Sequence, residues 1–281
     1  MTEEQKEEIR RIASLLDDPD ETTALNAMAE LLAREDELGD VPAELHESRD
    51  PLLRRRVHQL EAALLLRRRR KYFLARLCSP ETDFADLLVD VHLQWFDNDC
   101  RPEIEASLAG FFRRALSKKL VSLEDIAAFM TGENLAAEPD TTLKPELYCI
   151  GSILSEHTGA ASLLAGLAVR IAGGENGPFR VGRVLDDFAV CDRRNRIMLP
   201  ARNWRIFPPR DPKEITEWDT RNILRLASSN LFSAAVNGDS FRYILTIAQA
   251  LTGTGDDRIL DYFPYPYHPA DDPPDGGPPE R

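Results

Sequence analysis

The sequence predicts a mostly helical α+β fold, in which a small antiparallel sheet lies between helical N-terminal and C-terminal regions. Apolar residues recur at helical spacing through residues 1–118, and they do so again after residue 211. Between these regions, apolar and polar residues alternate with a period of two over residues 179–207. Consecutive strands flanked by runs of helices are typical of an α+β domain.

Start signals for helices recur in the N-terminal region. Asp18-Pro19 and Asp50-Pro51 each combine an N-cap residue with a proline at the first helical position, and Glu21 adds a capping-box acid to the first of them. Ser122 with Asp125 predicts a further short helix. The two Asp-Pro starts lie 32 residues apart, a spacing that suits helical-hairpin repeats.

The middle of the chain combines a helix of small residues with short strands. Residues 159–172, GAASLLAGLAVRIA, predict a central buried helix, because small side chains let neighbouring backbones approach closely. Gly173-Gly174 ends this helix. We expect strands over residues 179–185, 188–191, 196–199 and 203–207, with a hairpin turn at residues 192–195.

Helical patterning returns after Asp211-Pro212-Lys213-Glu214, which is another capped start. Two apolar-patterned segments joined at residues 237–239 predict an αα-hairpin. The proline-rich end of the chain predicts a disordered tail. The predicted organisation is therefore a helical region over 1–118, a core over 119–210, a helical hairpin over 211–260 and a disordered tail over 261–281.

Charge is strongly segregated along the chain. The formal net charge is −13, which argues against general binding of polyanions. Residues 1–48 carry 15 acidic and four basic residues, whereas residues 49–76 carry ten basic and two acidic ones. Because these opposite blocks are neighbours in sequence, we expect neutralisation between adjacent helices.

The most conspicuous basic run is Arg67-Arg68-Arg69-Arg70-Lys71. One interpretation is a binding patch for phosphate, nucleic acid or an acidic partner. The other is structural, because a run at about 100° per residue circles its helix and cations suit a helix C-terminus. We favour neutralisation by the acidic N-terminal helices, and we keep the binding patch as the alternative.

Several classes of site and location are not indicated by the sequence. Four cysteines, Cys78, Cys100, Cys149 and Cys191, lie far apart without a CxxC or paired Cys/His spacing, so we expect reduced thiols and no metal site. No phosphate-binding glycine loop is visible, and we expect no cofactor. The charged start and the lack of a long apolar run predict a cytoplasmic protein without a membrane span.

Three stretches, taken in order, resemble one known family. Residues 16–21, LDDPDE, with the helix after them resemble its N-terminal helical segment; residues 148–163, YCIGSILSEHTGAASL, resemble its loop into a central helix; residues 222–248 resemble its C-terminal hairpin. Together they make residues 12–255 similar to the SirB1-like branch of the transglutaminase-like superfamily, with a tetratricopeptide-like hairpin. The resemblance implies a papain/transglutaminase-like core, with a buried helix packed against a small antiparallel sheet.

The resemblance also implies where a catalytic site would lie. Family enzymes place a cysteine at the start of the central helix, a histidine on the next strand and a carboxylate beside it. The helix start corresponds here to residues around Ala161, which has no thiol, and the family's histidine position corresponds to Asp187. A carboxylate with a pKa of about 4 cannot replace an imidazole as a base at neutral pH without a large shift. Both catalytic groups are therefore expected to be lost.

Other residues offer alternative chemistry. Cys149 with His157, or Cys191 at the end of a strand, would be needed for a thiol-dependent transferase or protease. Ser162 would act as a nucleophile only with a base beside it. We favour structural roles for all four, and we expect a non-catalytic protein that acts as an interaction or scaffold module. Its partner is then a protein of unknown identity, with nucleic acid and membranes disfavoured by the overall charge and hydropathy.

Overall fold

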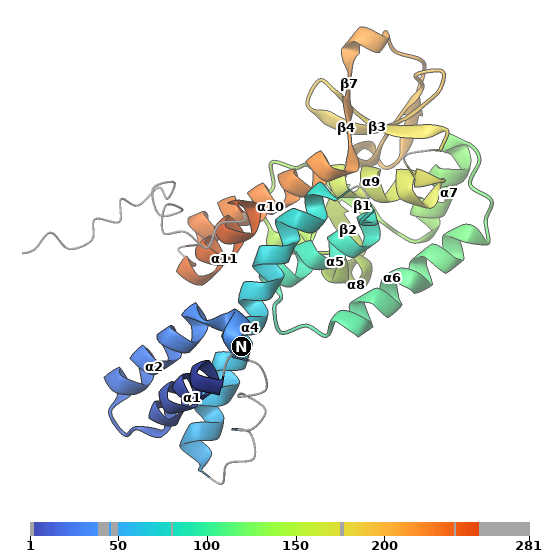
Figure 1. The fold of residues 1–281 in the computed structure, drawn as a ribbon. Helices are drawn as coiled ribbons and strands as arrows, with labels where there is room; N and C mark the ends of the chain where they lie inside the picture. Colours follow the sequence, from blue (N-terminus) through green and yellow to red (C-terminus); the bar gives the residue numbers. More distant parts are fainter. Residues whose placement is uncertain are drawn as a thin grey trace, which may run out of the picture. The chain divides into compact units, whose positions relative to one another are not determined.

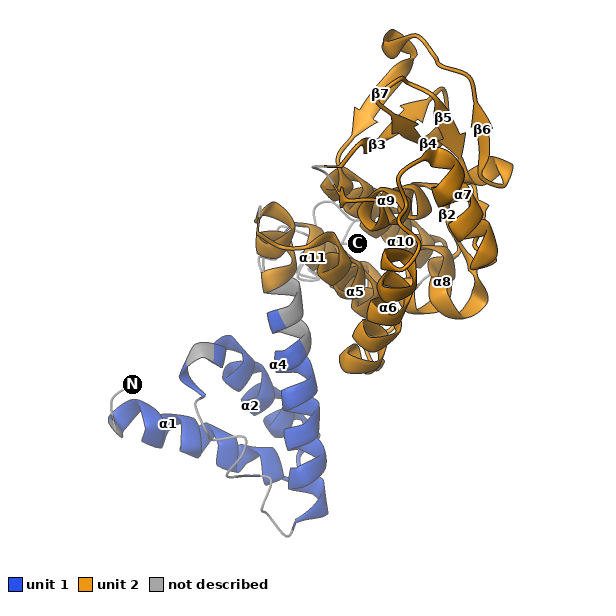
Figure 2. Cartoon of the chain, turned by 90° about the vertical axis from the view of Figure 1, so that its right-hand side faces the viewer, with its two compact units in different colours: residues 1–69 blue, residues 70–281 orange. Residues whose placement is uncertain are grey.

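The computed structural model describes residues 3–38, 45, 50–79, 81–174, 177–238 and 240–252. These residues belong to two compact units, residues 1–69 and 70–281 (Figure 2). The chain is mostly helical, and a five-stranded antiparallel sheet lies between helical regions, so the predicted α+β class is confirmed. The predicted tail, residues 261–281, lies outside the described residues.

Unit 1 is built from helices around a small apolar core. Its elements are α1 (Glu3–Ser14), the 3-10 helix η1 (Leu15–Asp17), α2 (Glu21–Ala33), η2 (Glu35–Glu37) and the first part of α4 (Pro51–Cys78). The buried side chains of Ile9, Leu16, Leu31, Val57 and Leu60 belong to this core. On α4, the guanidinium of Arg56 donates to the carbonyl oxygens of Leu16 at 2.7 Å and Asp18 at 2.6 Å. One arginine from residues 49–76 therefore binds two carbonyl oxygens at the C-terminal end of η1.

The predicted cap of α2 is displaced by two residues. Asp20, not Asp18, is the N-cap, and its carboxylate accepts hydrogen bonds from the amides of Thr22 and Thr23. Asp18 instead ends η1 and accepts from the amide of Asp20 at 2.8 Å. The prediction was wrong here because a turn of 3-10 helix occupies the residues before the proline. The predicted starts at Asp50-Pro51 and at Ser122 are confirmed, the latter as a complete capping box with Asp125.

Unit 2 begins within α4 and contains the sheet (Figure 1). Its helices are α5 (Phe84–Trp95), α6 (Arg101–Leu116), α7 (Leu123–Gly132), η3 (Pro145–Tyr148), α8 (Ile150–Glu156), α9 (Ala161–Ile171), η5 (Pro200–Arg202), η6 (Pro212–Glu214), α10 (Thr220–Asn237) and α11 (Phe241–Thr252). Its strands are β1 (Ala136–Glu138), β2 (Thr158–Ala160), β3 (Phe179–Val184), β4 (Asp187–Asp192), β5 (Ile197–Leu199), β6 (Arg205–Phe207) and β7 (Ile215–Trp218).

The larger sheet has the strand order β6-β5-β4-β3-β7, with every neighbouring pair antiparallel. The four strands expected from alternation are found as β3 to β6, and the predicted turn lies between β4 and β5. Strand β7 was missed, because Asp211-Pro212 begins the short 3-10 helix η6 and not a long helix. The long helix α10 begins later, with Asp219 as its N-cap. A separate parallel pair, β1 with β2, was also not predicted.

Helix α9 is the buried centre of unit 2. All nine residues from Ala161 to Val169 are buried, as its small side chains predict, and the helix packs against β3 and β4. A Cβ atom on Gly166 would lie 2.9 Å from the ring of Phe84, so α5 and α9 can pack this closely only around a glycine. Helices α5 and α6 share the core of α9, and the division expected at residue 118 therefore falls inside this unit.

The opposite face of the sheet has its own small apolar cluster, formed by Val184, Ala189, Cys191, Ile197, Leu199 and Ile215. After the sheet, α10 and α11 pack against each other and against α5, which confirms the expected pair of helices. Within the described ranges, no helix is long and apolar enough to cross a membrane.

Candidate functional site

The start of α9 is the position at which the resemblance implies a nucleophile. Ala160 is the N-cap residue and has no capping side chain, and Ala161 is 3% exposed. The next residue, Ser162, is fully buried. The helix start therefore presents backbone amides but no thiol, and its single hydroxyl is out of reach of solvent.

Asp140 closes this helix start from a distant part of the chain. Its Oδ2 atom accepts a hydrogen bond from the amide of Ser162 at 3.0 Å, and its Oδ1 atom accepts one from the Ser162 hydroxyl. A carboxylate at a helix N-terminus satisfies amides that have no partner within the helix and interacts favourably with the helix dipole. Asp140 thus performs the capping role that Ala160 cannot.

The backbone of Asp140 is fixed by two other elements. The hydroxyl of Tyr148, at the end of η3, donates to the carbonyl oxygens of Asp140 and Thr142, each at 3.0 Å. The side-chain amide of Asn230, on α10, donates to the same Asp140 carbonyl at 3.3 Å. Burial raises the pKa of Tyr148, and the negative charge of Asp140 adds to that shift, so its hydroxyl remains a donor. The carboxylate is therefore held in place by η3 and α10.

The electrostatic surroundings of Asp140 include one residue of the sheet. Burial raises the pKa of Asp140, while the hydrogen bonds from Ser162 and the positive charge of Arg183 oppose that shift. Arg183 lies on β3, and its own side chain also reaches Asp186 at 3.3 Å. The positive charge of Arg183 on β3 therefore acts both on the carboxylate that caps α9 and on Asp186, between β3 and β4.

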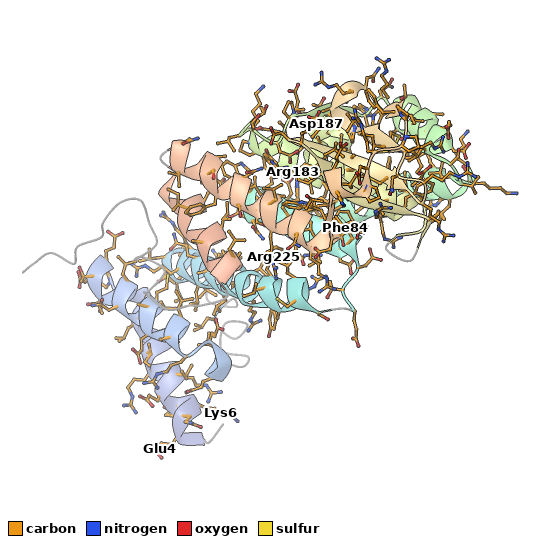
Figure 3. The ribbon with its side chains drawn as sticks, turned by 90° about the horizontal axis from the view of Figure 1, so that it is seen from above. Glu4, Lys6, Phe84, Arg183, Asp187 and Arg225 are labelled. Carbon is orange, nitrogen blue, oxygen red and sulfur yellow. The ribbon has the colours of Figure 1, made fainter. Side chains whose placement is uncertain are left out.

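Asp187, at the predicted histidine position, opens β4 and pairs with Val184 of β3. Its side chain is 39% exposed, and Oδ2 lies 3.9 Å from Nε of Arg202. Figure 3 labels Asp187 and Arg183, which come from neighbouring strands of the sheet. A partly exposed carboxylate opposite an arginine is suited to an ion pair. It does not replace the imidazole that a family enzyme would use as its general base.

The alternative pair of Cys149 and His157 is separated by a helix. Cys149 is the N-cap of α8, and His157 is its C-cap residue with a φ of 56°. Eight residues of helix at 1.5 Å each place their backbones roughly 12 Å apart. The thiol of Cys149 is buried, whereas the ring of His157 is exposed. The thiol–imidazole contact that the alternative interpretation requires is therefore absent from this pair.

The buried thiols are also poorly suited to nucleophilic attack. Burial raises the pKa of Cys149 well above its ordinary value, and the charges of Glu146 and Asp99 add to the shift. Burial raises the pKa of Cys191 to about 11, and this residue lies in the apolar cluster on the outer face of the sheet. In the described part of the chain, no hydrogen bond joins a cysteine sulfur to a histidine ring. Because the thiolate is the reactive form, both cysteines are held in the unreactive state.

Sequence reasoning missed a buried histidine on α5. His92 is 1% exposed; its Nε2 atom donates to Asp99 Oδ2 at 2.9 Å, and its Nδ1 atom accepts from the amide of Gly151 at 3.3 Å. Burial lowers the pKa of His92, while the hydrogen bond and charge of Asp99 oppose the shift. Both ring nitrogens are engaged, so neither can take a proton from a thiol. The signal in the sequence was a histidine on the apolar face of a helix, followed seven residues later by an acid.

His157 lies beside a different feature. It lines a cleft of about 200 Å³ together with Phe111, Arg114, Glu133 and other residues of α6 and α8. Arg114 and Glu133 form a two-pronged ion pair across this cleft, with distances of 3.0 Å and 2.6 Å. The two side chains therefore neutralise each other's charge within the cleft.

The structure describes the backbone of the basic run on α4 but only one of its five side chains. The backbone of Arg67-Arg68-Arg69-Arg70-Lys71 is helical, and the side chain of Arg68 is exposed. The side chains of Arg67, Arg69, Arg70 and Lys71 lie outside the described residues. Both the neutralisation and the binding patch remain predictions. Among the described residues, no group of three metal-ligating side chains comes together.

Comparisons with known proteins give no family assignment. No family model, no curated protein and no solved structure matches the chain.

Proposed function

We propose that the chain is a non-catalytic protein of the SirB1-like branch of the transglutaminase-like superfamily, and that it acts in the cytoplasm as a protein-interaction or scaffold module. The proposal joins the sequence resemblance to the geometry around α9. We propose in the same way that its core is of the papain/transglutaminase-like type.

The arrangement of unit 2 supports this proposal. A buried helix, α9, packs against the antiparallel strands β3 and β4, with helices on either side in sequence. The carboxylate of Asp140 binds the start of α9, and α9 itself packs against β3, so the helix start and this strand belong to one packed arrangement. Such a meeting of helix start and sheet is what a papain-like site would need.

One observation carries the non-catalytic part of the proposal. The carboxylate of Asp140 accepts both the amide and the hydroxyl of Ser162, at the helix start where a nucleophile would stand. Ala161 has no reactive atom, and Asp187 is a partly exposed carboxylate. The carboxylate of Asp140 thus occupies the helix start as a structural cap. The proposed function therefore lies in contacts made by the protein surface.

The thiol-dependent alternative receives no support from the geometry. It requires a cysteine beside a histidine, whereas Cys149 and His157 occupy opposite ends of α8. Cys191 faces the outer apolar cluster of the sheet. Binding of an acidic partner or of nucleic acid through Arg67–Lys71 stays as the second alternative.

Cysteine labelling tests the proposal. We expect iodoacetamide to modify the exposed Cys78 and Cys100 in the native protein, and to modify Cys149 and Cys191 only after unfolding. Mass spectrometry of digested protein identifies the sites, and a Cys78→Ser/Cys100→Ser variant serves as the matched control. Stoichiometric native labelling of Cys149 or Cys191, with a midpoint below the ordinary thiol pKa of about 8.5, would restore the enzyme hypothesis.

A further inference from the structure

The connection between α6 and α7 exposes apolar side chains that the core does not use. Leu116, the last residue of α6, is 77% exposed, and Val121, just before α7, is 75% exposed. In Figure 1 the connection runs along the right-hand side of unit 2. Two large aliphatic side chains within six residues are thus left in water, which solvates them unfavourably.

The same connection carries an unusual concentration of positive charge. Residues 106–123 contain four basic residues and no acidic one, in a chain with a net charge of −13. Arg114 is engaged by Glu133. Arg113, Lys118 and Lys119 are exposed, and within the described ranges none of them forms an ion pair. Three cations are therefore free to meet an external partner.

This segment is held in a defined shape. The hydroxyl of Ser117 donates to the Arg114 carbonyl at 2.7 Å, and the amide of Val121 donates to Asp125 Oδ2 at 3.2 Å. Leu120 packs against the main core, which fixes the connection from inside. The outward residues are consequently presented by an ordered backbone, so that binding would not have to order it.

Lys119 shows that the shape is maintained at a cost. Its φ is 49°, in the left-handed region that a residue with a Cβ atom adopts less readily than glycine does. A glycine or an asparagine would suit that conformation better.

We propose that Arg113, Leu116, Lys118, Lys119 and Val121, here called the basic corner, form a docking surface for an acidic segment of a partner protein. The partner presents carboxylates around apolar side chains, so that the cations are neutralised while Leu116 and Val121 are covered. This inference rests on the interaction role proposed above and names the surface that performs it. Charge complementarity also speeds association with such a partner.

A protein segment fits these observations better than other anionic partners. Nucleic acid and anionic membranes present denser negative charge than an acidic segment that is partly apolar, so the long-range repulsion of a chain with a net charge of −13 opposes them more strongly. Nucleic acid backbone also offers no apolar cover for Leu116 and Val121, which are both at least 75% exposed. An acidic segment with apolar side chains satisfies both features of the basic corner.

The test uses a fluorescent synthetic helical peptide of glutamate and leucine as probe, with the full-length chain, at two salt concentrations. We expect salt-sensitive binding that a triple variant, Arg113→Glu/Lys118→Glu/Lys119→Glu, weakens by at least about tenfold. Leu116→Ser/Val121→Ser should weaken it several-fold. The matched control, Lys144→Glu/Arg193→Glu/Arg194→Glu, makes the same change of charge at three other cations of unit 2 and should leave the affinity within about twofold.

Three results would contradict the proposal that the basic corner is a docking surface. They are failure of the wild-type chain to bind the peptide, equal weakening by the control triple variant, and tighter binding of phosphatidylserine vesicles or duplex DNA through the same residues. Circular dichroism of each variant separates loss of binding from loss of folding. Cysteine labelling is independent of this surface, so that failure here removes the basic corner and leaves the non-catalytic site standing.

Discussion

Replacing Asp140 with alanine is expected to lower the free energy of unfolding of unit 2 by about 3 kcal/mol. The substitution removes the cap on the Ser162 amide, which is worth about 1 kcal/mol, and leaves the buried hydroxyl of Ser162 without a partner, which costs about 1–3 kcal/mol more. Urea unfolding followed by tryptophan fluorescence measures this change. All three tryptophans, Trp95, Trp204 and Trp218, belong to unit 2, so that the signal reports on that unit.

Two further variants separate capping from loss of charge. Asp140→Asn keeps one acceptor oxygen and should lose less stability than alanine does. Asp187→Ala removes a partly exposed carboxylate of the same charge and should change the free energy of unfolding by no more than about 0.5 kcal/mol. Equal losses for Asp140→Ala and Asp187→Ala would show that the proposed cap contributes nothing specific.

Replacing Gly151 with alanine is expected to destabilise unit 2 by about 2 kcal/mol, within the range typical of overpacked cores. The new Cβ atom would lie 2.7 Å from Cε1 of His92, whose ring is held by Asp99 and by the Gly151 amide itself. The ring cannot move away without breaking one of these hydrogen bonds. Urea unfolding followed by tryptophan fluorescence again measures the loss.

A double-mutant cycle with His92→Ala identifies the cause of that loss. Removing the ring destabilises the protein by itself, but it also opens the space that the added Cβ atom needs. In the His92→Ala background, Gly151→Ala should therefore cost less than about 0.5 kcal/mol. If the two losses simply add, the contact between α5 and α8 is not what makes glycine necessary.

Local signals in the sequence were sufficient for much of the fold. The capping box of Ser122 with Asp125 and the alternation over residues 179–184 depend on neighbours in the chain, so that inspection of the sequence finds them. Strand β7 was missed because a proline after an aspartate starts a 3-10 turn as readily as a long helix, and the two are alike over four residues.

The candidate site depended on contacts that sequence reasoning could not reach. Asp140 caps a helix that begins 21 residues later, and the residue at the local cap position is an alanine. His92 meets Gly151 from a helix 59 residues away. Such pairs are created by tertiary packing and leave no periodic pattern in the chain. The absence of a thiol at residue 161, by contrast, was visible at once.

Amide hydrogen exchange of Ser162 tests most directly whether the start of α9 is a closed structural junction. Because Asp140 accepts this buried amide, we expect exchange as slow as that of the most protected amides of unit 2, and a large acceleration in Asp140→Ala. Exchange of Ser162 at the rate of an exposed amide in the wild-type protein would mean that the helix start is open to solvent, and the account of a capped, non-catalytic site would be contradicted.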